Sequence, residues 1–213
     1  MNLKSKFLTS LGITIFLALA SSSLVSAQNS TARMGIKGGF NVSNLYINNV
    51  SDENSRFGFN AGFYGQLVSS DVAALQLELL YTTKGTKATY NSVFSNETVK
   101  FNLNYLEVPV LAVIKLGKVM EIHAGGYAGY LLAANFNYNN STTTHDLDRN
   151  KFNSFDYGLA GGVGFNFGAV QLGARYNYGL AKIANSDAAQ AMVGNSKNSC
   201  AQLYLAFNLN SNQ

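Results

Sequence analysis

The sequence predicts an all-β protein: an eight-stranded antiparallel up-and-down transmembrane β-barrel with short periplasmic turns and four longer extracellular loops. Eight segments alternate apolar with polar residues at a period of two, which is typical of strands whose two faces meet different surroundings. Charged residues make up only 12% of the chain, about half of the ~25% usual in soluble domains. A surface that faces lipid explains this low charge.

The N-terminus has the pattern of a secretory signal peptide over residues 1–27, which leaves 28–213 as the barrel domain. Lys4 and Lys6 precede an apolar run over residues 7–20, and Ala27 ends a small-residue cleavage site. The run is shorter than the ~20 residues that a spanning helix needs. Export and a barrel together predict the outer membrane of a Gram-negative bacterium. The formal net charge of +4 includes two lysines of the leader, and so weak a bias does not predict nucleic-acid binding.

The clearest strand lies in Asn102–Gly117. From residue 106 to residue 114 every second residue is apolar, while the intervening positions include Glu107, Pro109 and Lys115. One face of this strand is therefore expected to meet lipid and the other the lumen. The eight predicted strands, in chain order, lie in Arg33–Asn44, Arg56–Val68, Val72–Lys84, Asn102–Gly117, Val119–Tyr138, Phe155–Phe167, Val170–Tyr178 and Ser199–Leu209.

The connections between these strands alternate in length. Three are tight, at Ser69–Asp71, near Gly117–Lys118 and at Gly168–Ala169. Four are long and polar, at about Leu45–Ser55, Gly85–Val99, Asn139–Asn153 and Leu180–Lys197. Short turns on one rim and long loops on the other are typical of outer-membrane barrels. Closure also removes the sheet edges that an apolar-faced open sheet would expose.

The alternative architecture is a soluble or surface-associated lipocalin-like ligand-binding β-barrel, whose apolar faces would point inward. In that barrel the mixed faces would form the water-exposed surface. Those faces carry many glycines and few charges, which is a poor composition for an exposed surface. The pattern therefore favours apolar faces outward, with Tyr130, Leu132 and Phe136 assigned to the lipid side.

Turn lengths predict which residues face each other across the hairpins. A two-residue turn at Gly168–Ala169 and three-residue loops at Ser69–Asp71 and Leu116–Lys118 fix the three registers. The predicted cross-strand pairs are Arg175 with Gly162, Glu78 with Gly62, Lys115 with Glu121, and Glu107 with Gly129. An eight-stranded lumen is narrow, so a glycine opposite leaves room for a long charged side chain.

The charged residues of the mixed faces are expected to form a lumenal network that fills the barrel. Such charges persist out of water only when they are paired. The network is predicted to consist of Lys37, Glu78, Glu107, Lys115, Glu121, Asp156 and Arg175. Structural plugging of the barrel is the favoured interpretation, and a binding or proton-linked role is the alternative.

No catalytic, cofactor-binding or metal site is predicted. The chain has two histidines, and neither His123 nor His145 has a Ser or Cys nucleophile in a fixed geometry nearby. His145, Asp146 and Asp148 could in principle bind a metal ion, but the sequence favours a solvated loop at these residues. Cys200 is the single cysteine, which excludes an intramolecular disulfide.

Pro109 predicts a local defect in its strand. Proline has no N–H to donate to a sheet ladder, and this one lies inside the ~9–11 residues that span the bilayer. We therefore expect a β-bulge or a break in pairing near Tyr105–Pro109.

Five short motifs, taken in order, resemble those of PorT-like outer-membrane β-barrel proteins. They are Glu78-Leu79-Leu80-Tyr81 with Lys84-Gly85, Tyr105-Leu106-Glu107-Val108-Pro109, Phe155-Asp156-Tyr157-Gly158, Gly161-Gly162-Val163-Gly164, and Arg175-Tyr176 with Tyr178-Gly179-Leu180. The resemblance implies an integral outer-membrane barrel of this size, and in some members an accessory role in protein secretion.

The function expected from the sequence is that of a small outer-membrane barrel with a plugged lumen, and not of an enzyme. Its role is expected to be structural, in surface interaction or in secretion assembly, played through the outer loops. The expected partners are outer-membrane lipids and secretion-system or surface partners on the extracellular side. The barrel is expected to be a monomer.

Overall fold

The computed structural model describes residues 33–46, 54–91, 96–138, 145–146, 152–185 and 196–210. The predicted signal peptide and most of the long connections lie outside these ranges. The strands are β1 (Met34–Tyr46), β2 (Asn54–Ser69), β3 (Ala73–Asn91), β4 (Asn96–Leu116), β5 (Met120–Tyr138), β6 (His145–Asp146), β7 (Phe155–Phe167), β8 (Val170–Lys182) and β9 (Lys197–Asn208).

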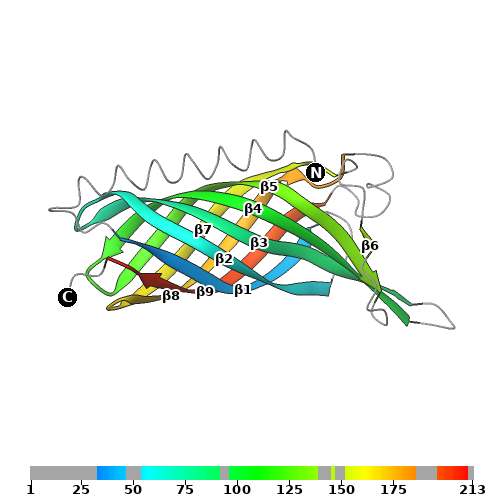
Figure 1. Cartoon of the computed structure of the whole chain (residues 1–213), viewed down its shortest axis with the longest axis horizontal. Helices are drawn as coiled ribbons and strands as arrows, with labels where there is room; N and C mark the ends of the chain where they lie inside the picture. The colour runs from blue at the N-terminus through cyan, green and yellow to red at the C-terminus, as the bar shows by residue number, and fades with distance from the viewer. Residues whose placement is uncertain are drawn as a thin grey trace.

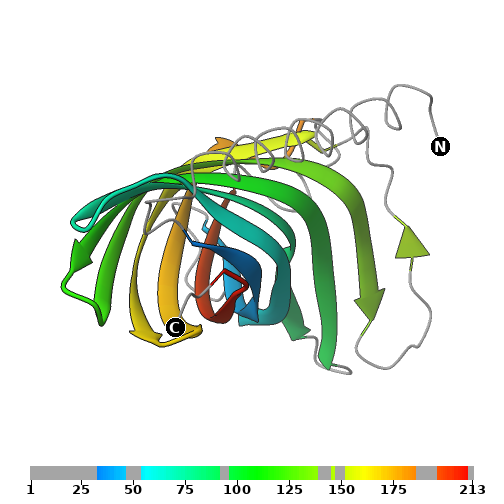
Figure 2. The ribbon, with the colours of Figure 1, turned by 60° about the vertical axis from the view of Figure 1, so that its left-hand side comes forward.

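Eight long strands form one closed antiparallel barrel (Figures 1 and 2). Around the barrel the order is β4, β3, β2, β1, β9, β8, β7 and β5, and the pairing of β4 with β5 closes the sheet. The two-residue β6 pairs with β5 through Asn135–Asp146 and Phe136–His145. The predicted eight-stranded up-and-down barrel is thus confirmed. No helix among the described residues is long and apolar enough to cross a membrane.

The two rims of the barrel differ in their connections. The β2–β3, β4–β5 and β7–β8 turns lie together at one end, on the left in Figure 1, and we call this end the turn rim. Both ends of the described chain meet there, since Met34 N donates to Asn210 Oδ1 at 2.9 Å and Leu209 N donates to Met34 O at 2.8 Å. The opposite end, where the longer connections lie, is called the loop rim.

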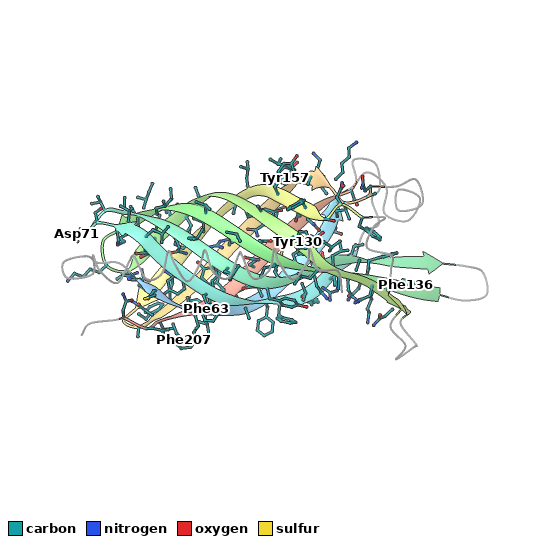
Figure 3. All side chains as sticks on the ribbon, turned by 45° about the horizontal axis from the view of Figure 1, so that its top comes forward. Phe63, Asp71, Tyr130, Phe136, Tyr157 and Phe207 are labelled. Carbon is teal, nitrogen blue, oxygen red and sulfur yellow. The ribbon has the colours of Figure 1, made fainter. Side chains whose placement is uncertain are left out.

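The apolar faces of the strands point out of the barrel. Phe40 and Phe57 are 74% and 72% exposed, and Phe63 and Phe207 also project outward in Figure 3. On β8 and β9 burial alternates residue by residue over most of each strand, as expected for one face outside and one in the lumen. A lipocalin-like barrel requires the reverse orientation, so that alternative is not supported.

Three neighbouring strands extend far beyond the others at the loop rim. β3, β4 and β5 have 19, 21 and 19 residues, whereas β7, β8 and β9 have 13, 13 and 12. The β3–β4 hairpin remains paired as far as Asn91–Asn96, so the prediction of a loop over Gly85–Val99 was wrong. Backbone pairing thus continues beyond the residues in which apolar and polar side chains alternate.

Two bulges change the predicted side-chain assignments. The β2–β3 turn lies one residue later than expected and Leu67 is an extra residue in β2, so Glu78 faces Tyr64 and the predicted Glu78–Gly62 pair was wrong. In β5 the register with β4 passes from Leu131 directly to Ala133, so Leu132 is an extra residue of this strand. Beyond this point the parity of β5 reverses. Phe136 therefore packs against a buried cluster inside, and its assignment to the lipid side was wrong.

The other predicted registers are confirmed. Arg175 lies opposite Gly162, Lys115 opposite Glu121, and Glu107 opposite Gly129. The turn after β4 occupies residues 117–119, one residue later than predicted. Gly62 faces a charged residue after all, because its partner in β1 is Lys37.

β4 has two irregularities in or next to Tyr105–Pro109, where the sequence predicts a strand defect. Between β3 and β4 the pairing stops at Val108 and Pro109 and resumes in the same register. Between β4 and β5 the ladder runs through Pro109 opposite Tyr127, and a register shift lies at Asn104/Tyr105. Proline is thus accommodated by a gap on one side of its strand only.

A prediction concerns Gly62, where β2 and β3 approach closely. A Cβ atom there would lie 2.0 Å from the carbonyl oxygen of Leu79, whereas a Cβ at Gly65 would meet nothing within 4 Å. Gly62→Ala is expected to lower the free energy of unfolding by about 1–3 kcal/mol, and Gly65→Ala to change it by less than about 0.5 kcal/mol. Urea titration in detergent micelles measures both, and equal effects would contradict this packing.

Candidate functional site

The barrel interior gathers nearly all of the buried charge of the described residues. All seven residues of the predicted lumenal network point inward and are at most 8% exposed. Six of them, all except Lys115, fall into three groups, which follow one another along β8 from the turn rim, near Gln171, Arg175 and Asn177. The structure therefore brings the predicted residues into one lumen, but not into one continuous chain of ion pairs.

The middle group is centred on Glu78. The Arg175 guanidinium donates two parallel hydrogen bonds to its carboxylate, both at 2.7 Å. Lys37 Nζ lies 3.2 Å from Glu78 Oε2, and Gln76 donates to Oε1 at 2.7 Å. A bidentate Arg–carboxylate pair fixes both side chains in geometry as well as in charge. β1, β3 and β8 are thereby connected across the lumen, which they surround from different sides.

Two tyrosine rings provide further contacts for the buried cations. Lys37 Nζ lies 3.5 Å from the centroid of the Tyr204 ring, and Lys84 Nζ lies 4.3 Å from that of Tyr127. Desolvated cation–π contacts of this kind contribute up to about 2 kcal/mol each. Both rings lie over glycines, because a Cβ at Gly173 would overlap Tyr204 and one at Gly158 would come within 2.8 Å of Tyr127.

The group nearer the loop rim is centred on Lys84, which the sequence analysis did not include in the network. Its ammonium group forms ion pairs with Glu107 and, at 3.2 Å, with Asp156. Asn177 donates to Glu107 Oε1 and Asn198 to Asp156 Oδ2, each at 2.9 Å. Lys84 lies six residues after Glu78 on β3, and an even spacing places both side chains on the same face of a strand. This spacing could have identified Lys84 from the sequence as a lumenal residue.

The group nearest the turn rim is centred on Glu121. Arg33 forms an ion pair with one of its oxygens, and Gln171 donates to the other at 2.9 Å. His123 lies between this carboxylate and Tyr204, with Nε2 3.4 Å from Glu121 Oε2 and Nδ1 3.3 Å from the tyrosine hydroxyl. The ring is thus held at both nitrogens.

Lys115, whose register partner is Glu121, hydrogen-bonds to the β2–β3 turn. Its Nζ donates to Ser69 Oγ at 2.7 Å and to Ser70 O at 2.8 Å. The predicted register was correct, but the long side chain reaches the neighbouring β2–β3 turn. Register alone does not determine which partner a lysine selects.

The interior is apolar toward the loop rim. A buried cluster there comprises Phe101, Leu103, Tyr105, Leu131, Ala134, Phe152, Ile183 and Ala184. Phe152 and Ala184 form an isolated β-bridge, and Asn153 N donates to Ile183 O at 2.8 Å. Segments that follow β8 and precede β7 are thus held against β4 and β5, and they add an apolar layer beyond the Lys84 group.

Of the candidate metal ligands His145, Asp146 and Asp148, the structure describes only the backbones of the first two. The backbones of His145 and Asp146 form β6, and Asp148 lies outside the described residues. Within those residues no group of three or more His, Cys, Asp or Glu side chains is placed to hold a metal ion. Cys200 is a buried free thiol.

The ionised side chains of the middle group and of the group nearer the loop rim together have no formal net charge. Lys37, Lys84 and Arg175 stand against the carboxylates of Glu78, Glu107 and Asp156. Each of these six side chains is at most 3% exposed and lies within ion-pair distance of an opposite charge. Chemically the arrangement holds strands together and occupies the lumen.

These features define a class: a small barrel with an apolar outer surface and a charged interior, as membrane barrels of eight strands have. The family model described as "Outer membrane protein beta-barrel domain" matches residues 26–185. The chain belongs to this family, and its location is the outer membrane of a Gram-negative bacterium. No curated protein sequence matches the chain.

Solved structures of similar fold are outer-membrane proteins. Neisserial surface protein A is 14% identical, with a TM-score of 0.52, and the match covers 84% of this chain and 99% of that one. Ail, the attachment invasion locus protein of Yersinia pestis, solved with the heparin analogue sucrose octasulfate, is 13% identical over 84% and 99% of the two chains, with a TM-score of 0.49. OprG of Pseudomonas aeruginosa is 13% identical over 84% and 94%, with a TM-score of 0.35. The first likeness speaks for the fold alone, and the other two support no functional argument.

A prediction follows from the position of Glu78 between two cations. Glu78→Gln leaves Lys37 and Arg175 buried without this countercharge, and is expected to lower the free energy of unfolding by about 3–5 kcal/mol. Asp71→Asn removes the same charge from an exposed turn and should change it by less than about 0.5 kcal/mol. Urea titration of the folded barrel measures both variants.

The double variant Glu78→Gln/Arg175→Met tests whether charge compensation is the cause. Removal of the guanidinium relieves part of the uncompensated charge, so the double variant should lose less stability than the sum of the two single variants. Additive losses would show that Glu78 acts by packing instead.

Proposed function

We propose that this protein is a closed, monomeric outer-membrane barrel that acts through its extracellular side and not by conducting solutes. The observation that supports this most directly is the bidentate Arg175–Glu78 pair, which spans the lumen with Lys37 beside it. An eight-stranded barrel leaves an interior that side chains can fill. No reaction is assigned to the lumen, whose charged groups are engaged with one another.

The extended β3–β4–β5 region supports a role at the cell surface. These strands continue past the residues that alternate apolar and polar, and Figure 1 shows them projecting at the loop rim. Asn102 and Asn104 point outward on β4, and Asn102 donates to Asn135 Oδ1 at 2.9 Å on β5. Amide pairs on an outer face suit water rather than lipid, so we place this part above the bilayer, as a surface for structural or adhesive contacts.

A second proposal is an accessory role in protein secretion, which the motif resemblance to PorT-like proteins favours. The charged residues of those motifs, Glu78, Lys84, Glu107, Asp156 and Arg175, all converge in the lumen. The motifs therefore encode the barrel interior, and a secretion partner would bind elsewhere. Deletion of the gene with loss of secreted proteins would support this role, and intact secretion would exclude it.

The closed lumen predicts a conductance phenotype. Purified barrel reconstituted in a planar lipid bilayer should show no stepwise conductance of porin size, because ion-paired side chains and the apolar layer obstruct the path. The heat-dependent gel shift of the same sample establishes that the barrel is folded. Regular large steps from folded protein would overturn the proposal.

The proposed surface role also predicts an orientation. An epitope tag inserted into the β3–β4 connection, between Asn91 and Asn96, should bind antibody on intact cells. The same tag in the turn at residues 117–119 should bind only after the outer membrane is permeabilised, because short turns face the periplasm. Labelling in the reverse order would place the extended hairpin on the wrong side for surface contacts.

A further inference from the structure

Two lysines face each other across the β8–β9 pair on the outside of the barrel. Lys182 is the direct register partner of Lys197. Both belong to the outward set of their strands, since Ala181 and Asn198, their neighbours in the chain, are buried inside. Like charges placed directly opposite each other in a sheet are destabilising, so this arrangement calls for a physical reason.

The pair differs sharply from the charges inside the barrel. Glu78, Glu107 and Arg175 all have an opposite charge within ion-pair distance. Among the side chains that the structure describes, no carboxylate forms an ion pair with Lys182 or Lys197. Within the described residues, charge is compensated in the lumen, whereas two facing ammonium groups lie on the outer wall.

The position of the lysines identifies the layer that they reach. Tyr176 and Tyr178 lie on the same outward face of β8, 50% and 41% exposed, and Leu203 and Leu205 continue the apolar surface on β9. Tyrosine on a lipid-facing surface marks the membrane–water interface. A register shift separates the Tyr178–Ser199 pair from the Lys182–Lys197 pair, and this step spans two residues of β9, or about 5 Å along the axis of a barrel with strands tilted ~40°. A lysine side chain can also bend back toward the interface.

We propose that Lys182 and Lys197 form a binding site for the phosphate groups of an anionic lipid in the outer leaflet. Phosphate accepts hydrogen bonds from both ammonium groups at once and removes the repulsion between them. The site faces sideways from the barrel wall, directly above the lipid-facing residues. This position suits a membrane lipid better than a soluble polyanion that approaches the loops from above.

A second pair of the same kind lies elsewhere on the barrel. Lys87 and Lys100 are register partners on β3 and β4. Lys100 belongs to the outward set of β4, because Phe101 is buried inside. Lys87 Nζ lies 5.9 Å from the centroid of the ring of Phe57, an exposed outward residue of β2. This second pair lies farther toward the loop rim than Asn102 and Asn104, which we place above the bilayer, so the lipid site is assigned to Lys182 and Lys197 alone.

The test measures binding of diphosphorylated lipid A to the detergent-purified barrel by native mass spectrometry, with phosphatidylcholine as the uncharged reference. Removing one lysine is expected to weaken lipid A binding about fivefold, and K182Q/K197Q about thirtyfold, at ~1 kcal/mol for each lysine. K182R/K197R keeps both charges and should bind as the unaltered chain does. K118Q removes an exposed lysine at the turn rim and is the matched control, with no expected change.

A stability measurement separates lipid binding from a structural role. In zwitterionic detergent K197Q should leave the free energy of unfolding unchanged or raise it, because the repulsion is gone. With lipid A present the same variant should gain less stability from the lipid than the unaltered chain does. The heat-dependent gel shift confirms that each variant is folded.

Three results would overturn the proposal. The first is equal lipid A binding by folded K182Q/K197Q and by the unaltered chain. The second is full competition by inorganic phosphate at millimolar concentration, which would indicate a site for free phosphate. The third is tighter binding of a soluble polyanion such as poly-glutamate than of lipid A, which would assign the lysines to an acidic macromolecule.

Discussion

The structure depends on the need to neutralise every charge inside a lumen that eight strands make narrow. An isolated ion out of water costs several kcal/mol even after relaxation, and Glu78, Lys84 and Glu107 are each 0% exposed. The carboxylate of Glu78 forms ion pairs with both Lys37 and Arg175. Lys84 does the same with Glu107 and Asp156. These contacts cross the barrel, so they determine which strands face each other as well as the charge of the interior.

Small residues make this arrangement sterically possible. Gly62 and Gly162 lie beside Lys37 and Arg175 on neighbouring strands, and Gly129 lies between Glu107 and Asp156. At Gly62 and Gly162 an added Cβ would collide with the backbone of the neighbouring strand, at Leu79 and Ala174, whereas at Gly129 it would make only ordinary contacts. These two glycines therefore allow neighbouring strands to approach closely beside the charged side chains.

Much of this architecture was predictable from the sequence, because a period of two assigns every residue of a regular strand to one side. The strand number, the outward apolar face and the inward position of Arg175 all follow from that period. The bulges at Leu67 and Leu132 did not follow, since neither site carries a glycine or proline and a bulge is selected by the pairing of two strands. After each bulge, the residues that had faced outward face inward and the reverse. Glu78 therefore pairs with Tyr64 and not with the predicted Gly62, and Phe136 faces the interior and not the lipid.

The choice of ion-pair partners was beyond sequence reasoning for a different reason. Register places residues within one hairpin, whereas Arg175 on β8 reaches Glu78 on β3 across the lumen. Such contacts depend on the curvature of the whole barrel and on side-chain length, neither of which a hairpin register contains. The motifs that resemble PorT-like proteins supply residues to these same contacts. The resemblance therefore rests largely on residues that form ion pairs inside the barrel, whereas the paired lysines of the outer wall and the outer part of the β3–β4 hairpin lie outside these motifs.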